Sequence, residues 1–545
     1  MPTAQTLPPR LALSAQDRRQ SPDETALLRR LDELYDEGKE VREKYAPEKE
    51  TERDLRLYRG EVGPKDREAY FEANFIEAFI DRMVAQLTDN RPIIRIEHRK
   101  AGLRQVAEVT QKVAGSVWDE EKVQRQSFKM AHSAAVERCA GLYTGFDPVT
   151  DRLVLEVLQK DQVVIDPAVM EAALIGQAEY LFIDREKPVE ELKYRFPGRG
   201  ASVKPDTTSS DASEQRKGRR VLSALFDALR NKAGSADALG RASVRECLVV
   251  DRQRSPDGTP MFPRGRVIVR TADLVLWDGP NPYWDGEFPI DWYDWGVDPK
   301  NPWGRSEAKR LMRMQLAFNQ LIDGLVENQL LTNFIQVVMD WDAVDESTVK
   351  KLQKLSSSLI IRKRNRNAAF TVQPPLPFGA DKIQLARAIF TFAQLLTGVT
   401  DVTLGETPGS LQSGQAIEGL QEGANLMTRS RASRIEDFYM RVGQKLISRV
   451  FQFFPSDRVV HLVGPTASAI DYAVKRSEWF IGDDGTEMSN EDRARALRDL
   501  RFVVSPGSSA PGTRIRRGEM MLKLFAATLV PGIEVLRAVD FPEPE

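Results

Sequence analysis

Residues 381–417 read DKIQLARAIFTFAQLLTGVTDVTLGETPGSLQSGQAI, and the interpretation of the whole chain starts from this stretch. Its first part predicts a helix over 381–397, because apolar residues recur there at the spacing of one helix face. That face carries Ile383, Ala386, Ile389, Phe390, Ala393 and Leu396. The polar, glycine-containing stretch 398–414 predicts an irregular loop. A long helix is then expected from Gln415 to Phe454, which would measure roughly 60 Å if straight.

A second long helix is predicted on the N-terminal side of this stretch. Residues 305–331 carry an apolar stripe at helical spacing, formed by Leu311, Met314, Phe318, Leu321, Ile322 and Leu325. Between the two helices lies the insertion 332–380, which is expected to be mixed. Its candidate elements are strands at 334–339, 359–362 and 369–372 and a helix at 346–355.

The N-terminal half of the chain is predicted to be helical first and strand-rich later. One charged helix is expected from Ser21 to about Tyr58, and another spans about 123–140. The stretch 197–218 predicts a flexible loop, because it is rich in Gly, Ser, Thr and Asp. No strand is assigned to the Trp-, Pro- and Asp-rich stretch 277–303. The predicted fold class is therefore α+β, mainly α.

Composition narrows the classes of function. The 545 residues include 78 Lys and Arg against 80 Asp and Glu, a formal net charge of -2. Proteins that coat nucleic acid non-specifically need many uncompensated cations, so that class is not expected. Cys139 and Cys247 are too few for a disulfide framework or a cysteine-built zinc site, which favours a reduced, intracellular protein. No segment is long and apolar enough to span a membrane, and the start lacks the features of a signal peptide, so no membrane partner is expected.

The common catalytic signatures are absent from the sequence. It contains no G-x-x-x-x-G-K-[ST] phosphate loop, no G-x-G-x-x-G after a strand, no H-E-x-x-H and no G-x-S-x-G. His98, His132 and His461 have no second His or Cys at ligand spacing, so neither a metal nor a cofactor is predicted. The S-x-x-K match from Ser306 to Lys309 lacks the S-D-N and K-T-G motifs that would activate its serine. A serine that caps the following helix is the simpler interpretation.

Two kinds of charged cluster leave alternatives open. Asp340, Asp342 and Asp345 could hold Mg²⁺ in a nucleic-acid-processing enzyme, although a solvated turn is favoured. The basic cluster 362–367 could contact phosphates or an acidic partner, or could be a solvated hairpin tip.

A second basic patch is formed by Arg429, Arg431 and Arg434. It precedes the acidic pair 436–437, so much of its charge is expected to be paired within the chain.

The order of these elements resembles the portal, or head-to-tail connector, proteins of tailed bacteriophages. The most specific stretch runs from Gly398-Val399-Thr400-Asp401 to Gly405 and on through Leu411-Gln412-Ser413-Gly414-Gln415 into the long helix. Other stretches similar to the family are Tyr70 to Leu87 with the following Asn90-Arg91-Pro92, the strand-rich part 262–290, and Pro302-Trp303-Gly304-Arg305-Ser306. The resemblance covers about residues 70–540 with gaps.

The resemblance implies an elongated protomer with wing, stem, clip and crown, which assembles into a ring, usually a dodecamer. The implied parts on this chain are a disordered N-terminal arm (1–20), the wing (21–304 and 415–504), two stem helices (305–331 and 381–397), the clip (332–380), a tunnel loop (398–414) and a short crown (505–545).

The implied function is a ring at the capsid vertex through which double-stranded DNA is packaged and ejected, with no catalysis and no cofactor. The implied partners are further copies of the chain, the DNA, the terminase large subunit, the head–tail adaptor or tail proteins, and the major capsid and scaffolding proteins. The implied location is the virion, and the host cytoplasm during assembly.

The resemblance also implies two sets of functional residues. The tunnel loop would line the channel with Asp401, Thr403, Glu406, Thr407, Ser410, Gln412 and Ser413. The clip would dock the motor or adaptor through Arg362, Lys363, Arg364 and Arg366. Hydroxyls and amides touch phosphates weakly and carboxylates repel them, so such a loop would let DNA slide.

Two other hypotheses remain beside the portal. One is a metal-dependent nucleic-acid-processing enzyme that uses Asp340, Asp342 and Asp345. The other is a ring-forming head-completion adaptor, although the usual chain of such an adaptor is much shorter than this one.

Overall fold

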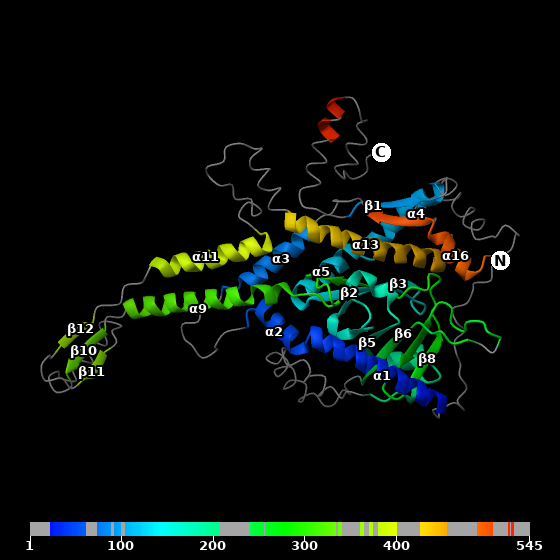
Figure 1. Ribbon diagram of the computed structural model, residues 1–545, viewed down its shortest axis with the longest axis horizontal. Helices are drawn as coiled ribbons and strands as arrows, with labels where there is room; N and C mark the ends of the chain where they lie inside the picture. Colours follow the sequence, from blue (N-terminus) through cyan, green and yellow to red (C-terminus); the bar gives the residue numbers. More distant parts are fainter. Residues whose placement is uncertain are drawn as a thin grey trace, which may run out of the picture. The chain divides into compact units, whose positions relative to one another are not determined.

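Figure 1 shows the protein as a computed structural model that divides into two compact units. Unit 1 comprises residues 1–51, 84–306 and 429–545, and unit 2 comprises residues 52–83 and 307–428. The structure describes residues 22–61, 73–88, 92–99, 104–205, 240–254, 257–333, 336–340, 360–363, 370–373, 380–399, 426–454, 488–504, 521–523 and 525–527.

The larger sheet of unit 1 has five antiparallel strands in the order β4-β5-β6-β7-β8. Their bounds are Val163–Ile165, Tyr180–Pro188, Arg241–Val249, Arg266–Arg270 and Val275–Pro280. Helix α1 (Pro22–Tyr45) covers one face of this sheet, where Leu28 and Leu31 join one buried cluster with Phe182 and Cys247. The apolar stripe of α1 is therefore the face that the sheet buries.

The second sheet of unit 1 has three antiparallel strands in the order β3-β2-β9. Their bounds are Arg152–Gln159 for β3, Cys139–Asp147 for β2 and Ile290–Asp294 for β9. Leu158 and Trp292 form one buried cluster with Leu181 and Val267 of the five-stranded sheet, so the two sheets pack face to face. Successive side chains of a strand point to opposite faces. Val157 therefore faces the other side, where helix α5 (Val123–Glu137) packs on β2 and β3.

The remaining described elements of unit 1 surround these sheets. Strands β1 (Ile94–His98) and β13 (Leu500–Val504) form an antiparallel pair, and the ring of Trp118 packs against Tyr439 and Phe502. The other elements are α4 (Arg104–Glu120), η2 (Lys160–Gln162), η3 (Ala172–Gln177), α6 (Val189–Arg195), η4 (Gly200–Ser202) and α16 (Asn490–Leu497).

Helix α13 (Leu426–Phe453) closes the free edge of β9 with cationic side chains. The carbonyls of Asp294 and Trp295 accept hydrogen bonds of 3.0 and 2.7 Å from Arg434. The carbonyl of Ile290 accepts one of 2.7 Å from the Lys445 ammonium, which also pairs with the Asp291 carboxylate at 2.9 Å. An edge strand exposes unpaired backbone groups, and here side chains of α13 satisfy carbonyls on the outer edge of β9.

The same helix face makes further contacts, one within β9 and others in the segment before it. Arg441 donates to the carbonyl of Trp292, and the guanidinium of Arg449 pairs with Asp285. The amide of Gln452 donates to the carbonyl of Pro282 at 2.6 Å and accepts from the backbone N–H of Trp284 at 3.1 Å. Another side of α13 holds β13, because the Gln444 amide bonds the backbone of Leu500 and Phe502.

Three local expectations from the sequence are wrong. The helix expected from Ser21 to Tyr58 is two helices, α1 and α2 (Glu48–Tyr58), separated at Ala46-Pro47, because a proline lacks the N–H that a helix interior needs. The helix expected to reach residue 140 ends at Glu137, and Arg138 takes a φ of 85° before β2 begins at Cys139. The stretch 277–303, which was assigned no strand, contains β9 and the end of β8.

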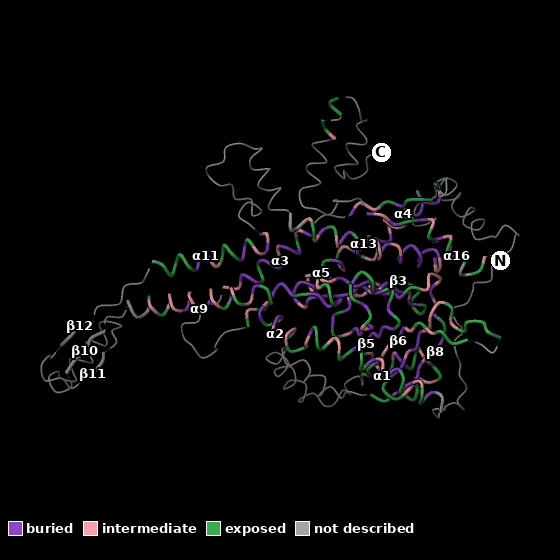
Figure 2. The backbone as a smooth tube through the Cα atoms, viewed as in Figure 1, coloured by how far each residue is buried: buried purple, intermediate pink, exposed green. Residues whose placement is uncertain are grey.

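Unit 2 holds two long helices and a small sheet. Its elements are the C-terminal part of α2, the N-terminal part of α3 (Phe75–Thr88), α9 (Glu307–Asn333), β10 (Gln336–Asp340), β11 (Ile360–Lys363), β12 (Phe370–Gln373) and α11 (Ala380–Thr397). Buried positions concentrate in the sheets of unit 1, whereas α11 is exposed along most of its length (Figure 2). The α+β class is thus confirmed, with helices and strands in both units.

Two glycines within helices should respond oppositely to alanine. A Cβ at Gly443 of α13 would overlap the Phe502 ring, whereas a Cβ at Gly324 of α9 would meet nothing within 4 Å. We expect Gly443→Ala to lower the free energy of unfolding by about 1–3 kcal/mol through overpacking. We expect Gly324→Ala to raise it by about 0.5–1 kcal/mol through helix propensity. Urea denaturation of the two variants measures both values, and equal shifts would contradict the packing of α13 on β13.

Candidate functional site

The candidate site is the α9–α11 hairpin of unit 2, residues 307–399. Helices α9 and α11 contact each other and run side by side, with the small sheet at one end (Figure 1). Their bounds agree with the two long helices predicted at 305–331 and 381–397. The three predicted strands of the insertion are also confirmed, each within two residues, as β10, β11 and β12.

The small sheet has the order β11-β10-β12 and mixes two kinds of pairing. β10 is parallel to β11, with Val337 opposite Ile360, and antiparallel to β12, with Gln336 opposite Gln373. Parallel neighbours need a crossover connection of about a dozen residues or more, which a hairpin turn cannot supply. Residues 341–359 connect the two strands in the sequence, and the helix predicted there lies outside the described residues.

Four phenylalanines join the helices of the hairpin to α3. The ring of Phe75 lies 5.6 Å from Phe318 of α9 and 6.1 Å from Phe390 of α11, and the ring of Phe79 lies 5.5 Å from Phe390. Two of these contacts are edge-to-face, a geometry that aromatic quadrupoles favour. This aromatic cluster sets α9, α11 and the start of α3 against one another within unit 2.

A buried glutamine of α9 caps the N-terminus of α3. The Gln315 Oε1 accepts from the backbone N–H groups of Phe75 and Ile76 at 3.0 and 3.3 Å. Its Nε2 donates to the carbonyl of Ala73 at 2.6 Å and to Asn319 Oδ1 at 2.7 Å. The first N–H groups of a helix have no partner inside the helix, so this side chain satisfies donors that would otherwise be buried unpaired.

The end of α2 is tied to α3 by polar contacts. The Tyr58 hydroxyl donates to Asp81 at 2.8 Å, and the Asn74 amide donates to the Tyr58 carbonyl at 2.6 Å. Partial burial, together with the hydrogen bond to Asp81 and its charge, raises the pKa of Tyr58 above its usual value. The phenol therefore stays neutral and remains a donor at physiological pH.

Helix α11 carries two apolar stripes, and the structure buries one of them. Ala386 and Ala393 are buried. Leu385, Phe392 and Leu395 are 51%, 59% and 60% exposed, and no described residue covers them. Exposed apolar patches of this kind mark surfaces that other proteins cover.

This second stripe was not predicted from the sequence, although its spacing is visible there. Leu385 and Phe392 are seven residues apart, which is the repeat of a helix seam, and Leu395 lies about one helical turn further on. A helix with apolar residues on more than one face needs more than one partner.

Most of the predicted tunnel loop lies outside the described residues. All seven of its predicted channel-lining positions, from Asp401 to Ser413, are in that part. The structure does describe where the loop begins: α11 ends at Thr397, and Gly398 takes a φ of 76°, with its N–H bonded to the Gln394 carbonyl at 2.9 Å. A left-handed glycine at this position is a common helix stop, because it has no Cβ to clash.

The predicted basic cluster starts at the end of β11. Arg362 and Lys363 are the last two residues of that strand, in register with Met339 and Asp340 of β10. Arg364 and Arg366 lie outside the described residues. The same register places Asp340 at the end of β10; the other two carboxylates proposed for a metal site, Asp342 and Asp345, lie outside the described residues.

The other candidate residues are scattered in the structure. Ser306 is buried and directly precedes α9, which fits a helix-capping position. His98 lies in β1 and His132 in α5, while His461 is outside the described residues. Within the described ranges, no group of three or more His, Cys, Asp or Glu could hold a metal ion.

The second basic patch is partly used inside the fold. Arg434 bonds the carbonyls at the end of β9, as described above, and Arg431 lies over the Trp295 ring at 5.1 Å. The charge of Arg434 is paired within the chain, as expected, but with the Asp294 carboxylate at 3.7 Å, while Asp437 pairs with Arg441 at 3.3 Å.

A comparison with models of known protein families identifies the family of this chain. The family model of the phage P22-like portal protein matches residues 29–545, nearly the whole chain. The chain belongs to this portal protein family. No curated protein matches it.

Membership in the portal family fixes the coarse function. Portal proteins are structural head-to-tail connectors of bacteriophages, which form an oligomeric ring at the capsid vertex. Capsid-related proteins are therefore partners of this chain. Among the described residues of this portal chain, no helix is long and apolar enough to cross a membrane.

Replacing the capping glutamine should weaken unit 2. We expect Gln315→Leu to lower the free energy of unfolding by about 2 kcal/mol, because the N–H groups at the start of α3 and the Ala73 carbonyl lose their partner in a buried place. The matched control is Gln320→Leu at an exposed position of the same helix, which should change it by less than about 0.5 kcal/mol. Urea denaturation measures both, and a similar cost for the two variants would contradict the capping role.

Proposed function

We propose that this portal chain forms the ring through which double-stranded DNA is packaged into the capsid and later ejected. In this proposal the ring docks the terminase large subunit during packaging and then the head–tail adaptor or tail proteins. It also contacts the major capsid and scaffolding proteins. The single observation that carries the proposal is the portal family match over residues 29–545.

The proposed parts follow the order of the chain. The wing would comprise residues 21–304 and 415–504, the stem would be α9 and α11, and the clip would be 332–380 with the sheet β11-β10-β12. The tunnel loop would be 398–414, the short crown 505–545 and the N-terminal arm 1–20. Two long helices joined by a compact sheet support the assignment of stem and clip.

In the proposed ring, the exposed stripe of α11 forms part of the contact between neighbouring copies. A cyclic ring uses a heterologous interface, so each protomer presents two different surfaces that fit each other. Leu385, Phe392 and Leu395 offer one such surface, since more than half of each is exposed in the single chain. In the proposed ring a neighbouring copy covers this stripe, and the number of copies is usually twelve in this family.

The proposed conduit needs a lining that touches DNA weakly. Asp401 and Glu406 are the charged residues of the loop 401–414, and both are acidic. Around them lie Thr403, Thr407, Ser410, Gln412 and Ser413, whose hydroxyls and amides bind phosphate weakly compared with Arg and Lys. The chain has a formal net charge of -2, so it lacks the excess of cations that tight binding of DNA to its surface would need. This near balance fits a channel through which DNA passes.

The proposed docking surface for the motor and adaptor is the basic end of the clip. Arg362 and Lys363 close β11, and Arg364 and Arg366 follow at once in the sequence. Basic clusters of this kind are complementary to acidic partner surfaces, and they act mainly on specificity and association rate.

The α11 stripe gives the test of ring assembly. We expect the wild-type chain to give rings with a central hole in negative-stain micrographs, and Leu385→Asp/Phe392→Asp to give mainly a 61.5 kDa monomer in mass photometry. The reason is that a carboxylate buried in an apolar interface has no partner. The control Thr391→Asp adds the same charge at another exposed position of α11 and should leave rings intact. A wild-type chain that stays monomeric would refute the ring itself.

Variants of the loop and of the clip should affect different steps, DNA packaging and terminase binding. Deleting residues 402–411 should leave ring assembly and terminase pull-down unchanged and impair DNA packaging. Arg362→Glu/Arg364→Glu should weaken terminase pull-down by at least about tenfold, since it reverses the charge of the docking surface. Loss of rings on loop deletion would make the loop structural, and unchanged pull-down would reduce the basic cluster to a solvated tip.

A further inference from the structure

The two edge strands of the sheet β3-β2-β9 differ in how their outward backbone groups are bonded. The carbonyls of Ile290, Trp292 and Asp294 in β9 accept hydrogen bonds from α13, so they point away from β2. In an antiparallel ladder this fixes which residues of β2 bond β9 and which bond β3. With the register Gly141↔Leu158 and Tyr143↔Glu156, the backbone groups of Leu155 and Val157 then point outward from the sheet.

No described residue bonds this outward edge at Leu155 and Val157. Edge strands are usually blunted, and β9 is covered along its length by α13, as described above. At one end of β3 the Gln162 side chain bonds the backbone N–H of Gln159 at 2.9 Å. Over Leu155 and Val157 the described part of unit 1 leaves a free template for one more strand.

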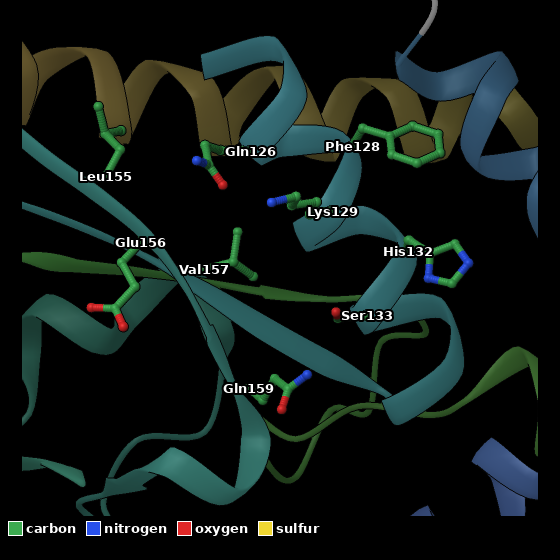
Figure 3. Close-up of a pocket in the computed structure, with 9 residues that line it drawn as sticks. All are labelled: Gln126, Phe128, Lys129, His132, Ser133, Leu155, Glu156, Val157 and Gln159. Atoms are coloured by element: carbon green, nitrogen blue, oxygen red, sulfur yellow. The ribbon is translucent and has the colours of Figure 1, made fainter. Parts of the chain in front are cut away.

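A cavity of about 540 Å³ lies beside that edge, between β3 and α5 (Figure 3). The side chains of Leu155 and Val157 form its strand side, and Gln126 and Lys129 project toward it from α5. Phe128, which is 43% exposed, stacks on His132 at a ring distance of 6.3 Å at the helix side of the cavity. The cavity therefore offers apolar contact area directly next to unpaired backbone groups.

The α5 side of this cavity carries a positive charge. Lys129 is exposed and forms no ion pair with a described residue. Glu156, the carboxylate of β3 at the cavity, points to the opposite face of the sheet, where it accepts from Arg185 at 3.0 Å. Arg185 in turn pairs with Glu246 at 2.7 Å, so this carboxylate is already engaged on the far face.

We propose that the free edge of β3 and the adjacent face of α5 bind an extended, acidic segment of a separate protein, which adds to the sheet as a fourth strand. The segment would bond the backbone of Leu155 and Val157. Its side chains on the α5 side would set apolar groups against the Leu155, Val157 and Phe128 side chains and a carboxylate against Lys129. Strand addition of this kind takes its affinity from main-chain hydrogen bonds and its specificity from alternate side chains. The proposal is independent of ring formation and of the channel.

A designed peptide tests this proposal on the full chain. The probe is a fluorescein-labelled Thr-Val-Thr-Asp-Thr-Val-Thr peptide, which places Val, Asp and Val on one face of a strand, and fluorescence polarisation measures its Kd. We expect binding below about 1 mM. Lys129→Glu should weaken binding by at least about tenfold and should favour the peptide with Lys in place of Asp. The matched control Arg125→Glu, an exposed cation on the same helix outside the cavity lining, should change Kd by less than about twofold.

Backbone methylation separates strand addition from simple charge attraction. N-methylation of one alternating set of peptide residues should abolish binding, and methylation of the other set should leave it, since only one set directs its N–H groups at β3. No binding up to about 1 mM, or equal effects of the two methylation patterns, would overturn the proposal. Two other outcomes would also overturn it. Displacement of the peptide by a poly-dT oligonucleotide would indicate a nucleic-acid site, and binding only to the dissociated monomer would indicate a second copy of this chain.

Discussion

The bonds from the cationic side of α13 to the carbonyls of β9 are the interaction on which unit 1 depends. A strand at the edge of a sheet leaves half of its backbone groups without partners, and burying them unpaired would cost several kcal/mol. Arg434 and Lys445 satisfy carbonyls at the two ends of β9 with charge-assisted hydrogen bonds of 2.7–3.0 Å. Because Gln444 of the same helix bonds β13, one helix ties together two sheets that lie far apart in the sequence.

Two surfaces that no other described residue covers lie in different units and have different chemistry. The exposed stripe of α11 is a helix face of large apolar side chains, which suits another helix of the same kind. The free edge of β3 is a row of backbone groups beside a cation, which suits an extended acidic segment. Under the two proposals, contacts with further copies and contacts with a different protein therefore involve separate surfaces.

The sequence predicted best where a single helix or strand carries its own signal. The bounds of α9 and α11 followed from apolar residues at helical spacing, and the three strands of the small sheet from short β-branched runs. The sequence could not predict β9, whose Ile290-Asp291-Trp292-Tyr293-Asp294 looks irregular until Lys445 supplies the partner for Asp291. The break at Pro47 was visible but was outweighed by the helical pattern on both sides.

The candidate site was predictable in outline and less so in its contacts. The helix–insertion–helix order and the stop at Gly398 were expected from the sequence. The cap that Gln315 provides for α3 was not, because it joins residues about 240 positions apart, and no local pattern reports such a distance. The second stripe of α11, formed by Leu385, Phe392 and Leu395, has a regular spacing in the sequence but was left out of the predicted apolar face of this helix.

The buried cations of α13 also bear on how the protein responds to ionic strength. Lys445 and Arg449 are almost fully buried and are already paired with Asp291 and Asp285. Salt screens exposed charges over about 8–10 Å of water, but it reaches buried pairs far less. These cations neither attract DNA nor loosen when the surrounding salt changes. A change in the surrounding ionic strength thus leaves the contact between α13 and the segment 285–291 unaffected.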